Sequence, residues 1–182
     1  MTQDNVPDAN VACSASPLAR VDTVTPSARG AVPSDATTTM HATTIAQNGA
    51  GLLITGRSGS GKSALALQCI GLGARLVADD RTALRLQAGT LTARAPASIA
   101  GLLEVRGLGL MRLSPVADVP LRAVVDLDTV ETERLPPYRE TRIMGIALPL
   151  FRRMEGAHVA SALLLCLAGA REVPAAPDAP AR

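Results

Sequence analysis

A glycine-rich stretch at residues 56–63, Gly-Arg-Ser-Gly-Ser-Gly-Lys-Ser, constrains the fold of this chain more than any other feature. It follows the apolar run 51–55 and precedes the largely apolar run 64–70, so the pattern G-x-x-x-x-G-K-S lies where a strand would turn into a helix. Glycines tolerate the backbone conformations that let successive N–H groups converge, and the first turn of a helix directs its free N–H groups to the same point. The stretch therefore predicts a loop that binds phosphate rather than a turn that binds nothing.

Two side chains at the end of the stretch add chemistry to this loop. Lys62 carries a mobile positive charge that suits the β- and γ-phosphates of a nucleotide, and the hydroxyl of Ser63 suits Mg²⁺. We expect ATP and Mg²⁺ to bind here. The expected nucleotide-binding residues are Gly56, Arg57, Ser58, Gly59, Ser60, Gly61, Lys62 and Ser63.

Composition narrows the class of protein. Apolar residues make up 47% of the 182 residues but aromatic residues only 1%, so the core must consist of Leu, Ala, Val and Ile, as is typical of mixed α/β sheets and not of aromatic platforms for nucleic acids. A net charge of +2 gives no reason to expect a nucleic acid or a membrane as partner. Cys13, Cys69 and Cys166 are few and widely spaced, which favours a reducing cytoplasm over disulfides or a zinc site.

The order of segments predicts one α/β domain between two tails. Residues 1–38 are rich in Ser, Thr, Ala, Pro and Asp without periodicity, which predicts a disordered leader, and residues 171–182 form a flexible tail. Residues 39–170 should form a mixed sheet with flanking helices. We expect strands at 38–47, 51–55, 75–78, 82–86, 90–94, 121–127 and 143–148, a strand or loop edge at 102–106, a surface loop at 128–142, and helices at 64–71 and 155–167.

The pair Asp79-Asp80 follows the predicted strand 75–78. Ligands of α/β proteins bind at the carboxyl ends of the strands, so this pair is expected beside the loop. One carboxylate could hold or orient Mg²⁺ and the other could accept a proton from an attacking hydroxyl. A turn or a helix cap is the plain alternative, but the position after the glycine-rich loop favours function.

Three further places carry charge but are ambiguous by themselves. Glu104 and Arg106 would share a face of an extended segment, which suits a metal–phosphate centre and an ordinary ion pair equally well. An arginine of the charged segment 131–142 could neutralise a phosphoryl group during transfer, or could simply be solvated. His41 alone would be an ordinary histidine.

Taken together, five stretches resemble the catalytic domain of HPr kinase/phosphorylase over residues 40 to 168. They are Met40-His41, the segment 51–63, the segment 76–80, Leu-Leu-Glu-Val-Arg-Gly-Leu-Gly at 102–109, and Glu-Arg-Leu at 133–135. The resemblance implies a bacterial, cytoplasmic serine kinase that phosphorylates the phosphocarrier protein HPr with ATP and Mg²⁺, regulates the phosphotransferase system, and in many members reverses the reaction by phosphorolysis. It also implies a fold similar to the nucleotide-binding core of phosphoenolpyruvate carboxykinase and assembly into homo-oligomers, commonly hexamers.

The same resemblance assigns roles to residues by motif. It implies Ser63 and Glu104 as Mg²⁺ ligands, to which the position of Asp79 adds a third candidate. Asp80 would be the proton acceptor in the kinase direction and the donor in the reverse one. His41, Lys62 and Arg134 would complete the active site, and the segment 103–112 would serve both reactions.

The chain also departs from the family pattern. The family's N-terminal domain is replaced by the leader, so we expect a short form, and Ala64 stands where a Glu is usual. The segment 149–154 lacks the family's Arg- and Gly-bearing loop linked to phosphorolysis, so kinase activity is the better supported of the two. Two alternatives stay open: a small-molecule kinase that uses 128–142 as a lid, and a nucleotide sensor without catalysis.

Overall fold

The structure, a computed structural model, describes residues 35–170. Most of the predicted leader and the whole predicted tail lie outside these residues. Residues 35–38, which the prediction placed in the leader, form the beginning of strand β1 instead. None of the helices in the described part is long and apolar enough to cross a membrane.

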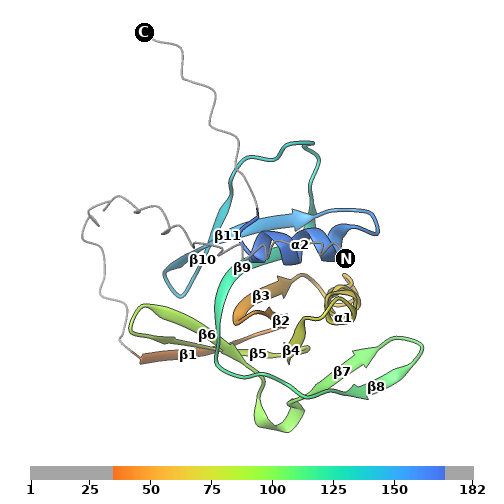
Figure 1. The fold of residues 1–182 in the computed structure, drawn as a ribbon. Helices are drawn as coiled ribbons and strands as arrows, with labels where there is room; N and C mark the ends of the chain where they lie inside the picture. Colours follow the sequence, from red (N-terminus) through yellow and green to blue (C-terminus); the bar gives the residue numbers. More distant parts are fainter. Residues whose placement is uncertain (1–34, 171–182) are drawn as a thin grey trace, which may run out of the picture. The chain divides into compact units, whose positions relative to one another are not determined.

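Strands dominate the described part of the chain, as the figures show (Figure 1). The strands are β1 (Asp35–Met40), β2 (Thr43–Gln47), β3 (Ala50–Thr55), β4 (Arg75–Ala78), β5 (Thr82–Gln87), β6 (Thr90–Arg94), β7 (Leu102–Val105), β8 (Gly109–Arg112), β9 (Val119–Val130), β10 (Glu140–Ile143) and β11 (Ile146–Arg153). The helices are α1 (Lys62–Gly71), α2 (Val159–Leu167) and a short 3₁₀ turn at Ala97–Ile99.

Nine of the strands form one mixed sheet, which confirms the predicted mixed α/β class. Its order is β1-β5-β6-β9-β3-β2-β4, and β11 joins β9 and carries β10. The pairs β3–β9 and β9–β11 are parallel, whereas β2 is antiparallel to both β3 and β4. Strands β3, β4 and β9 therefore run in the same direction, and their carboxyl ends lie at one edge of the sheet. Strands β7 and β8 form a separate two-stranded sheet.

Local sequence explains the first hairpin and the first helix. The turn Asn48-Gly49 joins β2 to β3 with φ of 50° and 77°, the left-handed pair that matches the twist of hairpin strands. Helix α1 ends at a glycine, Gly73, two residues after its last helical residue. Gly73 has φ 99°, its N–H donates to the carbonyl of Ile70, and the N–H of Ala74 donates to the carbonyl of Cys69.

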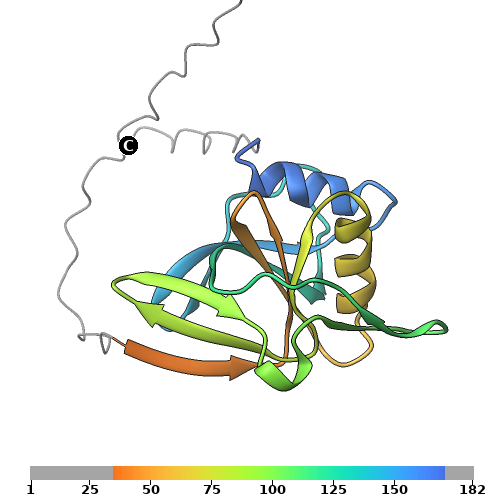
Figure 2. The ribbon, with the colours of Figure 1, turned by 60° about the horizontal axis from the view of Figure 1, so that its bottom comes forward.

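The sheet buries apolar side chains on both faces. On β3, Leu52 and Ile54 point to the face that α1 and α2 cover, while Leu53 points to the opposite face. The two helices pack against each other on that side (Figure 2). The opposite core is closed by residues of β5, β6 and β11. Burying one leucine side chain contributes about 1.5–3 kcal/mol to the stability of the fold. Since many such side chains pack on both faces, the sheet and the helices are held in place, and so is the edge at which α1 begins.

The region after β9 differs from the prediction. Strand β9 runs to Val130, the loop shortens to 131–139, and the expected strand 143–148 is split between β10 and β11 by a turn at Met144-Gly145, with φ of 50° and 83°. Strand β10 was not predicted because its charged residues, Glu140 and Arg142, suggested a surface loop. In the structure they lie on the exposed face of the strand and alternate with less exposed residues. Helix α2 begins at Val159, not at residue 155, and the hairpin partner β8 was not foreseen.

Candidate functional site

The glycine-rich loop (residues 56–63) connects β3 to α1, as predicted. Gly56, Gly59 and Gly61 have φ of 143°, 79° and 100°, values that L side chains rarely adopt. A Cβ at Gly56 would lie 2.6 Å from Oγ of Ser60, so the turn closes only with glycine there. Ser60 Oγ is buried and has no hydrogen-bond partner among the described residues. A loop that presents N–H groups and an unsatisfied hydroxyl fits a phosphate oxygen.

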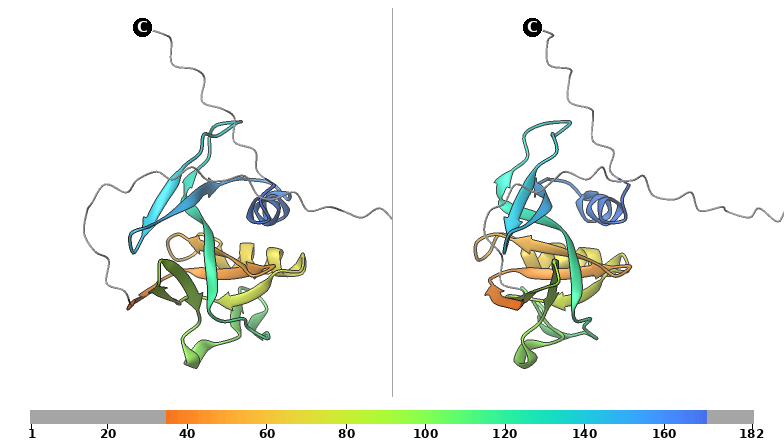
Figure 3. Two further views of the ribbon diagram at one scale, coloured as in Figure 1. Left: turned by 60° about the vertical axis from the view of Figure 1, so that its left-hand side comes forward. Right: turned by 90° about the vertical axis from the view of Figure 1, so that its left-hand side faces the viewer.

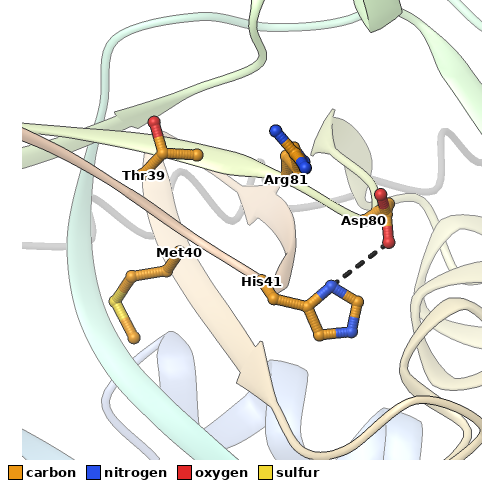
Figure 4. Close-up of a pocket in the computed structure, with 5 residues that line it drawn as sticks. All are labelled: Thr39, Met40, His41, Asp80 and Arg81. Atoms are coloured by element: carbon orange, nitrogen blue, oxygen red, sulfur yellow. Dashed lines mark ion pairs between the residues drawn. The ribbon is translucent and has the colours of Figure 1, made fainter.

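Lys62 connects this loop to two other candidate residues. Its Nζ donates to the carbonyl oxygens of Gly56 (2.9 Å) and Arg57 (3.1 Å) and to Nε2 of His41 (3.0 Å). Because an ammonium group can only donate, Nε2 of His41 accepts, and the ring proton lies on Nδ1. Nδ1 is 3.2 Å from Oδ1 of Asp80 (Figure 4). Lys62, His41 and Asp80 thus form one series, joined by a hydrogen bond between Lys62 and His41 and by an ion-pair contact between His41 and Asp80.

Asp79 is the hub of a second network. Its Oδ1 accepts hydrogen bonds from Oγ1 of Thr43 (2.7 Å) and Oγ of Ser63 (2.9 Å), and its Oδ2 accepts one from the backbone N–H of Glu104 (3.2 Å). Asp79 is only 6% exposed, whereas the side chain of its neighbour Asp80 is 69% exposed. The two adjacent carboxylates therefore differ: one is buried and fixed, and the other is open to a reactant.

The β7–β8 hairpin places Glu104 and Arg106 at the loop. Glu104 is exposed and bonds to Asp79 through its backbone. Nη2 of Arg106 lies 4.0 Å from the place that a Cβ of Gly59 would take. No hydrogen bond or ion pair joins Arg106 to another described residue, so its guanidinium faces the glycine-rich loop with its donors unused.

Arg134 is the predicted site residue that the structure does not bring to the others. It lies exposed in the segment 131–139, which is held by ion pairs from Arg139 to Glu131 (2.7 Å) and Glu133 (3.0 Å). Figures 1 and 3 show this segment and the β7–β8 hairpin on opposite sides of the sheet.

Sequence reasoning missed one residue of the site, Asp128. Both of its carboxylate oxygens are 3.0 Å from the backbone N of Arg57, so it fastens the start of the glycine-rich loop to the end of β9. Asp126 in turn accepts hydrogen bonds from the Asp128 N–H (3.0 Å) and from Oγ1 of Thr129 (2.7 Å). The available signal was the one that identified Asp79, an acidic residue at the carboxyl end of a buried strand, but residue 128 was assigned to a surface loop.

A pocket of about 480 Å³ adjoins the exposed carboxylate (Figure 4). It is lined by Thr39, Met40, His41, Asp80 and Arg81. Within residues 35–170 no three His, Cys, Asp or Glu side chains are arranged as a metal cage. The hydroxyl of Ser63 and the backbone of Glu104 are bonded to Asp79 all the same. Mg²⁺ usually takes only one or two protein ligands beside substrate phosphates.

Comparisons with known proteins show similarity to one family. Residues 34–117 match the model of the HPr Serine kinase C-terminal domain. Among curated proteins, HPr kinase/phosphorylase of Clostridium tetani is 42% identical over 97 residues, which cover 51% of this chain and 30% of that protein. The enzyme of the same name from Aromatoleum aromaticum is 38% identical over 112 residues, covering 54% and 36%. The matched part thus spans about a third of these relatives.

A solved structure shows the same fold. The Hpr(Ser) kinase/phosphatase from Coxiella burnetii aligns with a TM-score of 0.63 and 24% sequence identity, over 73% of this chain and 90% of that one. At this sequence identity the similarity shows a shared fold and nothing about function.

Proposed function

We propose that the protein transfers the γ-phosphoryl group of ATP to a serine hydroxyl of an HPr-like phosphocarrier protein, because residues 34–117 match the model of the HPr Serine kinase C-terminal domain. The observation that carries the proposal is the series Lys62–His41–Asp80, which links the glycine-rich loop to an exposed carboxylate through contacts of 3.0 and 3.2 Å. The proposal includes a nucleotide-binding core similar to that of phosphoenolpyruvate carboxykinase.

In this proposal the glycine-rich loop binds the phosphates of ATP. The N–H groups at the start of α1 and the positive end of the helix dipole attract the anion. Lys62 exchanges its contacts with the carbonyls of Gly56 and Arg57 for phosphate oxygens, which offer a full negative charge where the carbonyls offer a partial one. Asp128 keeps the loop in place while Lys62 moves.

Ser63 and Glu104 are the proposed magnesium ligands. Ser63 donates its hydroxyl proton to Asp79, so the lone pairs of Oγ are free to face a cation. Asp79 already accepts three hydrogen bonds, so we assign it the orientation of Ser63 rather than direct coordination. When bound, Mg²⁺ supplies neutralisation of the charge on the β- and γ-phosphates.

Asp80 is the proposed base for the acceptor hydroxyl. Its carboxylate is held on one side by the Nδ1–H of His41 and is otherwise open. When Lys62 turns to the phosphates, Nε2 of His41 loses its donor, and the histidine can reorient with the arriving substrates. A carboxylate as exposed as that of Asp80 suits a hydroxyl on the surface of another protein better than a small acceptor, which kinases enclose.

The proposal is tested by incubating the protein with HPr, Mg²⁺ and labelled ATP and locating the label by mass spectrometry. We expect phosphoserine on HPr. The variant Asp80→Asn should bind ATP as the wild type does and lose phosphoryl transfer by a factor of about 10² or more, the usual contribution of a general base. Label on a metabolite of a cell extract would indicate a small-molecule kinase instead. ATP binding without any transfer would indicate a nucleotide sensor.

A further inference from the structure

The β7–β8 hairpin (residues 102–112) contacts the site through β7 and Arg106, while Leu108 of its turn and Leu110 of β8 are exposed. Leu103 is fully buried and anchors β7, which lies against α1. The backbone of Glu104 bonds to Asp79, and Arg106 reaches the glycine-rich loop. Both strands pair only with each other among the described residues, so the hairpin stands out from the main sheet (Figure 2).

Two leucines are exposed on this hairpin. Leu108 is 71% exposed and Leu110 is 65% exposed. Leu110 is the cross-strand partner of Glu104, and partners directly opposite each other in an antiparallel pair have side chains on the same face. Leu110 is therefore the immediate apolar neighbour of a proposed magnesium ligand, while the pair Leu103 and Met111 occupies the other face.

Exposure alone would not distinguish these leucines. Leu135 and Leu165 are 73% and 61% exposed on other elements, and single exposed apolar side chains are common. What distinguishes Leu108 and Leu110 is that they are two residues apart on the hairpin that carries Glu104 and Arg106, with Leu110 directly opposite Glu104. A protein that offers its serine to Asp80 would meet this hairpin as it approaches.

We propose that Leu108 and Leu110 form a docking surface for the protein that carries the acceptor serine. The proposal rests on the proposed function and specifies the acceptor further: apolar side chains lie beside its serine. Arg106 and Arg112 outnumber Glu104 on the hairpin, so the rim of the acceptor's patch is acidic or neutral rather than basic. Covering Leu110 places the acceptor against Glu104, which positions the hydroxyl near the metal and excludes water.

The experiment compares five variants with the wild type in steady-state transfer to HPr. Leu108→Ala and Leu110→Ala should each raise the KM for HPr by about tenfold, as expected when one side chain near the centre of an interface is removed. The KM for ATP should stay within about twofold of the wild type. Leu135→Ala and Leu165→Ala, which remove equally exposed leucines elsewhere, should change neither constant, and Leu110→Met should restore most of the affinity.

Direct binding separates this inference from the proposed function. Fluorescence anisotropy of labelled HPr with the protein and a non-hydrolysable ATP analogue needs no turnover. Binding that weakens in Leu108→Ala and Leu110→Ala supports the docking surface even if no phosphate is transferred. Binding that is absent in the wild type, or equal in wild type and variants, overturns it. A change of oligomeric mass in light scattering, with KM for HPr unaltered, would assign the leucines to a contact between copies of this chain and also overturn it.

Discussion

The position of Arg106 beside the glycine-rich loop suggests a role for its side chain. As an exposed arginine it would be a solvated charge, but its guanidinium lies over Gly59 of the glycine-rich loop, and no described residue pairs with it. A guanidinium presents its donors in a planar fork that matches phosphate oxygens. In the proposed kinase, Arg106 therefore contacts the nucleotide phosphates bound by the glycine-rich loop.

Replacing Arg106 by Gln should weaken MgATP binding about 10- to 100-fold, because a hydrogen bond to a charged group contributes about 1.5–3 kcal/mol. AMP, which lacks the β- and γ-phosphates, should bind both proteins alike. Titration calorimetry with the two nucleotides measures the effect. Arg112→Gln, an exposed arginine at the base of the same hairpin, is the control and should bind MgATP normally. Equal affinities in Arg106→Gln and the control would remove Arg106 from the site.

The candidate residues differ in how far sequence could locate them. The pattern at 56–63 and the pair Asp79-Asp80 follow strands whose apolar runs are plain, so their shared sheet edge could be predicted. The separate roles of the two aspartates could not, because burial of Asp79 depends on Thr43 and on the backbone of Glu104, far away in the chain. Asp128 was missed because charge was taken as the sign of a loop, although its strand continues past it.

At the scale of the element, the preferences of single residues explain the first hairpin turn and the end of α1. The edge strands β8 and β10 were not predicted. The Asn48-Gly49 turn and the stop at Gly73 are set by backbone preferences of the residues themselves. Strands β8 and β10 are short and lie at edges. Strand β8 begins with Gly109, and β10 carries Glu140 and Arg142 on its exposed face, so what makes them strands is their pairing with β7 and β11.

Helix α1 yields a pH-dependent prediction through Cys69. The thiol is fully buried in the core beneath the helix, and this burial raises its pKa to about 11 from an ordinary value of 9.0. The folded protein thus holds the proton more tightly than the unfolded chain does. The resulting stability is complete below pH 9 and is lost as the pH rises from about 9 to 11, by about 2–3 kcal/mol in all.

Urea unfolding between pH 8 and 11 measures this loss. The slope of the unfolding free energy with pH should be shallower in Cys69→Ala than in the wild type, and unchanged in Cys166→Ala, whose residue is only partly buried. In the native protein at pH 8, peptide mapping should show iodoacetamide on Cys166 well before Cys69, since the thiolate is the reactive form. Rapid alkylation of Cys69 would mean that its helix opens readily.

Across the whole molecule, the carboxylate of Asp79 joins segments that lie far apart in the chain. It follows β4 and accepts hydrogen bonds from β2, from the start of α1 and from β7. Each of these elements carries part of the site: the histidine precedes β2, the glycine-rich loop precedes α1, and the β7–β8 hairpin contains Glu104 and Arg106. The same side chain therefore couples folding to the geometry of the site.

Substitution of Asp79 should lower the stability of the fold, whereas substitution of Asp80 should leave stability unchanged and lower turnover. Asp79→Asn replaces one acceptor oxygen by an NH₂ group that faces donors, so we expect a loss of about 2–4 kcal/mol in urea unfolding together with weaker MgATP binding. Asp80→Asn should change stability by less than about 0.5 kcal/mol, because the residue is exposed and Asn accepts its left-handed backbone at φ 63°.

If Asp79→Asn does not fold, a milder variant tests the same hub. Thr43→Val removes one hydrogen bond of 2.7 Å to the carboxylate with little change of shape, and should cost about 1 kcal/mol while leaving Asp80 in place. Such a variant would still transfer phosphate, with a raised KM for MgATP because Asp79, which orients Ser63, is held by one hydrogen bond fewer. Equal unfolding midpoints for Thr43→Val and the wild type would show that the hydrogen bond from Thr43 to Asp79 does not stabilise the fold.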